Sequence, residues 1–373
     1  MSSSPLQRRG SEARGLEPRA REPRVLLEAD AEMAESVHLL ASRKPGAALK
    51  LPMARLFLAT FAGVSLLLAA LVFVVDYTVD PYGHFAEAHD AHPYEPSDGS
   101  RAPAYMLNRS LFKLIHLDKF MAETAARGEA VQLLVGDSLG KQVNPRLLAE
   151  ATGRPWFNLA FGGANLIENT LLIEHLIARN GTNGERIERI LWNFPFTRIR
   201  LQPKDEMTRA LAVKDRVYAH LFTFESLRAT VFSLRKRWFG IDVIDPVRNL
   251  PVDELVAYNI RRFQVDTEGM AWPGEMLDRV TAVTQKALAA GIEVVFLVVP
   301  VHPDLQAVFE RDFADRFARY RSFLDGSCVI DLTPDAATRW PAAHFRDDIH
   351  LAAPHIPALT RAVEAELAQG CTA

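Results

Sequence analysis

Five short, almost wholly apolar segments between residues 130 and 333 constrain the fold of this chain more than any other feature. Such segments are typical of strands buried on both faces, as in parallel sheets covered by helices on either side. The stretches around them have helical hydrophobic periodicity. We therefore predict a three-layer α/β/α sandwich with a five-stranded parallel sheet. The expected strands are Ala130–Gly136, Trp156–Phe161, Ile187–Phe194, Glu293–Val301 and Val329–Thr333, and the expected helices are Asn108–Ala126, Leu166–Arg179, Pro273–Ala290, Asp304–Phe323 and Ala353–Ala368.

A longer apolar run precedes these segments. The twenty residues Leu56–Val75 carry no charge, and as a helix they would rise about 30 Å, the thickness of a bilayer core. Lysines and arginines lie between residues 43 and 55, whereas residues 76–100 contain neither. By the positive-inside rule, the N-terminus is expected in the cytoplasm and the main domain outside it. The run is longer than a signal-peptide core, so we predict an uncleaved single-pass anchor in the inner membrane with a periplasmic domain.

Composition indicates the remaining boundaries. The polar, arginine-rich N-terminal segment shows no sustained hydrophobic period, which is typical of disorder, and Met53 is an alternative start. A helical, arginine-rich insertion at about 198–270 interrupts the strand–helix order, and it forms either a wall of a substrate site or a solvated excursion. The predicted parts are a cytoplasmic tail at 1–52, an anchor at 53–77, a linker and leading helix at 78–125, and the α/β domain at 126–371.

Charge and cysteine content exclude some functions. The net charge of -3 and the lack of zinc-finger, basic-helix or RNA-binding signatures argue against a nucleic-acid partner. The two cysteines, Cys328 and Cys371, are too few for a disulfide framework, but an extracytoplasmic domain would allow them to pair. The linker histidines His84, His89 and His92 lack metal-site spacing, so we expect no metal and no cofactor.

The first expected strand ends in Gly136-Asp137-Ser138-Leu139-Gly140. In open parallel sheets, ligands bind beyond the carboxyl ends of the strands. Ser138 would therefore lie at the ligand-binding edge, near helix N-terminal N–H groups able to stabilise an oxyanion. Gly-Asp-Ser also occurs in ordinary turns, where Asp or Ser caps a helix.

A second motif, Asp347-Asp348-Ile349-His350, lies just before the last expected helix. A serine hydroxyl becomes a good nucleophile only when a base takes its proton, and that base needs an acceptor that fixes its tautomer. His350 and Asp347 would supply both functions from one loop. The combination with Ser138 is far more specific than either motif alone.

Two further turns are expected at the same edge of the sheet. The second strand leads into Gly162-Gly163, where a ligand can approach the backbone closely. The third strand ends at Asn193 amid apolar neighbours. Its amide would be either a satisfied structural group or a donor to a developing oxyanion.

These four blocks resemble those of the SGNH/GDSL hydrolase superfamily, whose members contribute a Ser, a Gly, an Asn and a C-terminal DxxH. The resemblance covers residues 126–370 and implies a flavodoxin-like fold. In this chain the third block reads Trp-Asn-Phe rather than the GxND of the family, and the first block lacks the family's longer consensus. The roles implied are catalysis by Ser138, Asp347 and His350, and an oxyanion hole formed by the Ser138 N–H, the N–H of Gly162 or Gly163, and the Asn193 side chain.

A membrane anchor followed by an external SGNH-like domain also resembles proteins that acylate bacterial cell-surface polymers, as in exopolysaccharide O-acetylation and teichoic acid D-alanylation. This implies an esterase or O-acyltransferase with an acyl-serine intermediate, acting on acetyl groups of an extracytoplasmic polysaccharide. The implied partners are an acylated or acyl-accepting glycan, the membrane and a membrane acyl-transfer protein. Two other interpretations stay open: a non-catalytic SGNH-fold module that binds glycan or a membrane partner, and the nucleophile elbow of α/β-hydrolases, which Gly136-x-Ser138-x-Gly140 also fits.

Overall fold

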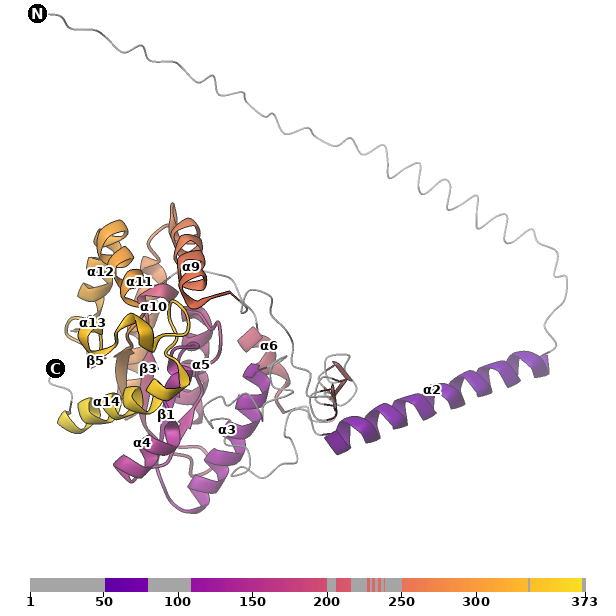
Figure 1. Cartoon of the computed structure of the whole chain (residues 1–373). Helices are drawn as coiled ribbons and strands as arrows, with labels where there is room; N and C mark the ends of the chain where they lie inside the picture. Colours follow the sequence, from indigo (N-terminus) through magenta and orange to yellow (C-terminus); the bar gives the residue numbers. More distant parts are fainter. Residues whose placement is uncertain are drawn as a thin grey trace, which may run out of the picture. The chain divides into compact units, whose positions relative to one another are not determined.

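The computed structural model describes residues 51–79, 109–199, 206–215, 250–334 and 336–370, together with single positions between 227 and 238 (Figure 1). Nearly all of the predicted N-terminal tail, much of the linker and of the insertion, and Cys371 lie outside these residues.

The described strands form one parallel sheet in the order β2-β1-β3-β4-β5. This is the order of the flavodoxin-like fold, so the predicted five-stranded parallel sheet is confirmed. The strands are β1 (Val131–Val135), β2 (Trp156–Asn158), β3 (Ile187–Asn193), β4 (Glu293–Val298) and β5 (Val329–Asp331).

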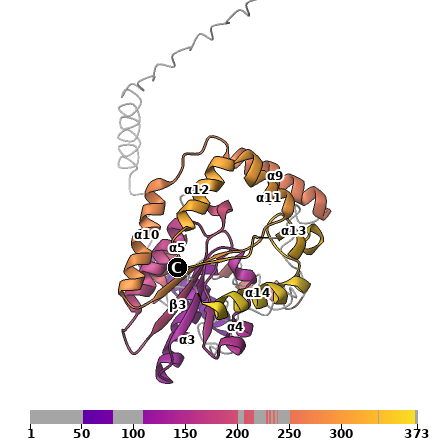
Figure 2. The same cartoon turned by 90° about the vertical axis from the view of Figure 1, so that its left-hand side faces the viewer.

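Helices cover both faces of this sheet. α4 (Pro145–Thr152) packs with α14 (Ile356–Gln369), and α5 (Leu166–Arg179) packs with α10 (Gly274–Ala289). The two pairs lie on opposite sides of the strands (Figure 2), as right-handed crossovers require when the chain moves first from β1 to β2 and then back past β1 to β3. The site at the carboxyl ends of the strands therefore lies between two helical layers.

Strand β2 is shorter than predicted and ends at Asn158, whose side chain is hydrogen-bonded to backbone groups beyond the end of β1. Its Nδ2 donates to the carbonyls of Gly140 (3.0 Å) and Val143 (2.9 Å), and its Oδ1 accepts from the N–H of Ala160. Buried backbone groups need such partners where a ladder stops. Asn158 thereby ties the end of β2 to the segment that follows β1.

The single helix predicted at 304–323 is two helices, α11 (Pro303–Asp312) and α12 (Ala314–Leu324). The chain leaves helical geometry at Phe313 (φ -127°, ψ 27°). The Phe313 ring packs against Phe263 of the insertion helix α9 (Val252–Thr267), with ring centroids 5.5 Å apart. The break therefore coincides with the docking of α9.

Aromatic packing fixes the end of β3. Trp192 and Phe194 are fully buried, their rings lie 5.5 Å apart, and the Tyr320 hydroxyl of α12 donates to the Phe194 carbonyl at 2.7 Å. Asn193 lies between these two residues. Its backbone is thus held by a dense core, which limits the positions that its side chain can take.

α2 (Leu51–Val79) is the one helix among the described residues that is long and apolar enough to cross a membrane, over Arg55–Thr78. The large apolar side chains along it, such as Leu56 and Leu67, are exposed. They form no part of the core beneath the sheet.

Gly136 passes the end of β3 at very short range and provides a test of this geometry. Its φ is 149°, and a Cβ there would lie 2.6 Å from the Asn193 Cβ and 2.9 Å from the Asn193 carbonyl oxygen. We expect Gly136→Ala to lower the free energy of unfolding by about 3 kcal/mol, because overpacking and backbone strain each cost about 1–3 kcal/mol. Urea unfolding of the detergent-solubilised chain measures the loss.

The matched control is Gly274→Ala, at the start of α10, where a Cβ would meet only the Trp272 ring at 4.0 Å. We expect this change to alter stability by less than about 0.5 kcal/mol. Equal losses in the two variants would show that the close approach at Gly136 is wrong.

Candidate active site

Ser138 lies on the turn that follows β1, between β1 and the short 3-10 helix η1 (Gly140–Gln142). Ser138 is partly exposed, while its neighbours Asp137 and Leu139 are fully buried. Asp137 shapes the turn, because its Oδ1 accepts the N–H of Leu139 at 2.9 Å. The turn therefore presents Ser138 at the carboxyl edge of the sheet. Among the described residues, the Ser138 hydroxyl makes no hydrogen bond.

Asp347 and His350 form a paired unit in one loop. Nδ1 of the His350 ring lies 2.8 Å from Oδ2 and 3.0 Å from Oδ1 of Asp347. The same carboxylate accepts the backbone N–H groups of Ile349 (2.9 Å) and His350 (2.7 Å). A neutral imidazole that donates from Nδ1 has its basic lone pair at Nε2. The loop thus supplies an oriented base.

The pKa values of the two carboxylates of this loop are shifted in opposite directions. Burial alone would raise the pKa of Asp347, but the hydrogen bonds from His350 and Ile349 outweigh it and hold that pKa below its ordinary value of 3.8. Burial, together with the charge of Asp347, raises the pKa of Asp348, and a hydrogen bond from Asn259 offsets part of that rise. Asp347 therefore stays ionised, as the partner of a catalytic histidine must.

One hydrogen bond joins this loop to the serine turn. The backbone N–H of Leu351, the residue after His350, donates to Oε1 of Gln142 on η1 at 2.8 Å. Gln142 is buried and follows Ser138 by one short turn. The structure thereby brings together the Ser138 and Asp347–His350 motifs, which are more than 200 residues apart in sequence.

Two other elements hold the loop from its far side. Asn259 of α9 donates from Nδ2 to Oδ1 of Asp348 at 2.7 Å, and the N–H of His302 donates to the Asp348 carbonyl at 2.9 Å. The insertion helix is therefore part of the support of the loop, although it carries no motif. Sequence reasoning missed Asn259 and Gln142, because each becomes meaningful only through a partner far along the chain.

Gly162 and Gly163 lie beside the serine turn. The chain leaving β2 stays paired with the exit of β1, since the N–H of Phe161 donates to the Gly136 carbonyl at 2.9 Å. Gly163 has a φ of 81°, a conformation that favours glycine. Both glycines are partly exposed.

A buried lysine supports the segment leading to these glycines. Lys113 of α3 (Arg109–Ala126) is 4% exposed, and its Nζ donates to the carbonyls of Asn158 (3.0 Å) and Ala160 (2.5 Å). The ammonium group thus binds two backbone carbonyls at the point where β2 ends.

Asn193 faces the serine turn from the end of β3. It is buried, and its Nδ2 donates to Oδ1 of Asp137 at 2.7 Å. The other oxygen of that carboxylate accepts Nε of Arg198, also at 2.7 Å. The amide is thus bound directly to the residue before Ser138. One of its two N–H groups serves Asp137, which leaves the other for the oxyanion role stated above.

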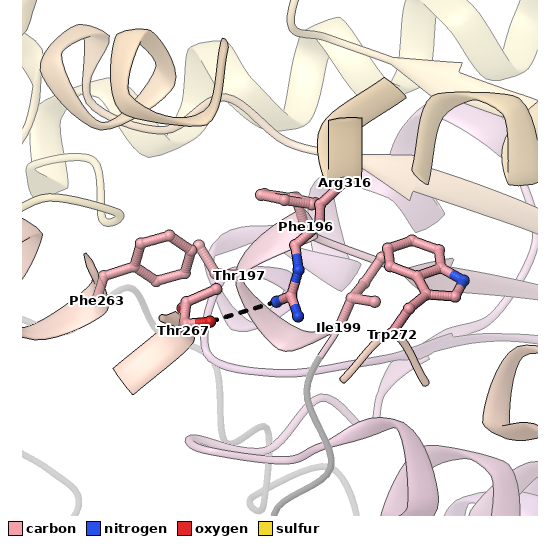
Figure 3. A pocket seen from close by; sticks show the side chains of 7 residues that line it. All are labelled: Phe196, Thr197, Ile199, Phe263, Thr267, Trp272 and Arg316. Carbon is pink, nitrogen blue, oxygen red and sulfur yellow. Dashed lines mark hydrogen bonds between the residues drawn. The ribbon is translucent and has the colours of Figure 1, made fainter. Parts of the chain in front are cut away.

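Two hollows lie apart from these residues. A small pocket of about 10 Å³ lies among Phe196, Phe263 and Trp272, where Nη1 of Arg316 donates to the Thr267 carbonyl (Figure 3). It has room for about one water molecule. A wider polar groove of about 610 Å³ lies at the amino ends of the strands, around Ala130 and Ile187. Neither is lined by Ser138 or His350.

Of three comparisons with known proteins, only the one with solved structures gives matches. No family model matches the chain, and no curated protein matches it. Solved structures that match include a protein provisionally assigned as an SGNH hydrolase from Slackia heliotrinireducens (15% identity, TM-score 0.34, covering 64% of this chain and 99% of that one). TesA matches at 15% identity and a TM-score of 0.35, over 64% of this chain and 97% of its own length. A provisional lipolytic protein of the G-D-S-L family from Desulfitobacterium hafniense matches at 10% identity and 0.30, over 64% and 99%.

At such identities and TM-scores these matches carry no conclusion about family or activity. The chemistry of the site rests on the hydrogen bonds of this chain.

The two carboxylates of this loop predict changes of opposite sign in the free energy of unfolding when each is replaced by Asn. A lowered pKa in the folded state stabilises the protein above the unfolded value and is lost as the pH falls through the folded value. Asp347→Asn should therefore destabilise the chain at pH 7, by a margin that shrinks below pH 3.8. The raised pKa of Asp348 in the folded state means that the protein loses stability as the pH rises past the unfolded value of 3.8. Asp348→Asn, which keeps an acceptor for Asn259, should therefore gain stability relative to wild type between pH 3 and pH 7.

Denaturant unfolding of both variants and the wild type at several pH values measures these differences. If both variants shift the free energy of unfolding in the same direction at pH 7, the electrostatic assignment of the loop is wrong.

Proposed function

We propose that this chain is a serine esterase or acyltransferase of the SGNH type, with Ser138 as nucleophile, His350 as base and Asp347 as the carboxylate that orients it. The observation that carries the proposal is the hydrogen bond from Leu351 to Gln142. It ties the loop with an oriented imidazole to the turn with a partly exposed serine.

The reaction follows from these positions. Nε2 of His350 takes the Ser138 proton while Oγ attacks the ester carbonyl carbon, and the carbonyl π electrons move to oxygen. The N–H groups of Ser138 and of Gly162 or Gly163, with the Asn193 amide, stabilise that oxyanion. The oxyanion collapses, and the leaving alcohol takes the proton from His350. An acyl-Ser138 ester is left.

A second nucleophile resolves the acyl-enzyme in the same geometry. Water releases the free acid, whereas a sugar hydroxyl receives the acyl group, and His350 again removes the proton of the attacking group. Hydrolysis and transfer thus use the same residues. They differ only in which hydroxyl reaches the acyl-Ser138 carbonyl.

We assign the acyl group as acetyl and the polymer as an extracytoplasmic polysaccharide. Support comes from α2, which is long and apolar enough to anchor the chain, and from the basic residues before it, which favour a cytoplasmic N-terminus. Cys328 is disulfide-bonded, and disulfides persist in oxidising compartments such as the periplasm. A membrane acyl-transfer protein is the proposed acyl source when the reaction is transfer.

Labelling with a fluorophosphonate tests the nucleophile. Membranes containing the full chain should label, and Ser138→Ala should abolish labelling and lower hydrolysis of p-nitrophenyl acetate by at least about 10³-fold, because the attacking oxygen is gone. Ser322→Ala, at an exposed position on α12, is the control and should label as the wild type does. Labelling that survives Ser138→Ala would refute Ser138 as nucleophile.

The substrate is tested separately. Purified full-length chain should release acetate from acetylated polysaccharide or transfer acetyl groups to it, and cells that carry Ser138→Ala should show altered O-acetyl content of their surface polymer. Unchanged O-acetyl content, together with no release or transfer in vitro, would contradict the acetyl–polysaccharide assignment but not the serine chemistry. A chain that never labels yet binds the glycan would instead be the non-catalytic binding module.

A further inference from the structure

A buried carboxylate lies directly before the proposed nucleophile. The Asp137 side chain is 1% exposed and accepts three hydrogen bonds: from the N–H of Leu139 (2.9 Å), Nδ2 of Asn193 (2.7 Å) and Nε of Arg198 (2.7 Å). A buried charge is tolerated only when it is paired and hydrogen-bonded. Without Arg198, this negative charge would also oppose the oxyanion that forms one residue away.

Arg198 is held firmly where it meets Asp137. It ends the short helix η2 (Phe196–Arg198), directly after β3, and its N–H donates to the Pro195 carbonyl at 3.0 Å. The Phe196 ring packs against Phe309 and Tyr320 in the core. The Arg198 side chain is 19% exposed. A mostly buried guanidinium on a packed turn loses little freedom when it pairs.

The orientation of the Asn193 amide depends on that carboxylate. The two ends of an amide have nearly the same shape, so its surroundings decide which end faces which partner. An ionised Asp137 accepts N–H and repels a carbonyl oxygen, and it therefore selects the orientation in which Nδ2 faces the serine turn. The opposite end, Oδ1, is buried without a hydrogen-bond partner among the described residues.

A structural amide would be expected to satisfy its oxygen first, because an unpaired buried acceptor is costly. Here the N–H end is satisfied instead. Gly136 and Gly140 both pack against the Asn193 Cβ, so the side chain has little room for another position. This arrangement favours a donor that is aimed at the turn over a group that only fills the core.

We propose that Arg198 and Asp137 form a positioning pair that aims the Asn193 amide N–H at the oxyanion site. Asp137 binds one N–H of Nδ2 and leaves the second for the substrate oxygen. Arg198 pairs the charge of Asp137, so that this carboxylate orients Asn193 without repelling the oxyanion. The proposal rests on the proposed function, and neither residue of the pair touches the reacting atoms.

A double-mutant series in the full-length chain tests the pair. Arg198→Met should lower kcat for p-nitrophenyl acetate by about 10²-fold with little change in KM, since loss of one oxyanion donor costs about 10²–10³-fold in kcat. In an Asn193→Ala background the same change should cost clearly less, because the part of the effect that passes through Asn193 is already lost and only the repulsion between Asp137 and the oxyanion remains. Arg198→Lys, which keeps the charge, should recover part of the loss.

The matched control is Arg189→Met. Arg189 is on β3, the strand that precedes η2, has a similar exposure of 22%, and pairs with Glu293 at 2.6 Å. It lies before the strand end that carries Asn193, so its loss should change kcat by less than about 2-fold. An Arg198→Met loss that is equally large in the wild-type and Asn193→Ala backgrounds would overturn the proposal.

A readout independent of activity separates this proposal from the proposed function. The side-chain amide protons of Asn193, identified by their loss in Asn193→Ala, should shift in the NMR spectra of both Asp137→Asn and Arg198→Met. Thermal melting identifies any variant that fails to fold. Unshifted amide signals in the folded variants would refute the positioning pair, even if the enzyme is active. If the two variants show the shifts but the wild-type chain never labels with fluorophosphonate, only the proposed function is refuted.

Discussion

The site depends on a hydrogen bond from the backbone of Leu351 to the side chain of Gln142. Neither partner is a proposed catalytic group, yet each adjoins one: Leu351 follows His350, and Gln142 lies on the turn after Ser138. A buried backbone N–H needs an acceptor, and the amide of Gln142 supplies it from the other half of the domain. The loop of His350 and the turn of Ser138 are therefore joined through the satisfaction of a main-chain donor.

The sheet could be predicted from sequence because its signal is local. The strand segments are mostly apolar and the helices between them show a helical hydrophobic period, so the local pattern distinguishes the two kinds of element. Motif position was equally local: Ser138 lies on the turn after β1, Asn193 ends β3, and parallel strands place their ends at one edge. The break at Phe313 was not predicted; it coincides with a contact to Phe263 of the insertion, which helical periodicity does not reveal.

The supporting residues could not be predicted for the same reason. Gln142, Asn259, Lys113 and Arg198 are ordinary polar residues in their own segments. Each acquires its role from a carbonyl, an N–H or a carboxylate that the fold brings from elsewhere. The reactive groups of such a site are recognisable as short motifs, whereas the groups that orient them are scattered. The insertion illustrates this, since it interrupts the strand–helix order and nevertheless anchors Asp348.

Lys113 has a consequence for where the functional unit begins. Its ammonium group binds the backbone at the end of β2, although α3 precedes the first strand in the sequence. A shortened protein that starts at β1 would keep every described strand and every motif, but it would lack the cation that binds the carbonyls of Asn158 and Ala160. Helix α3 thus belongs to the α/β domain, and any transplantation of this domain onto another N-terminal segment has to carry that helix with it.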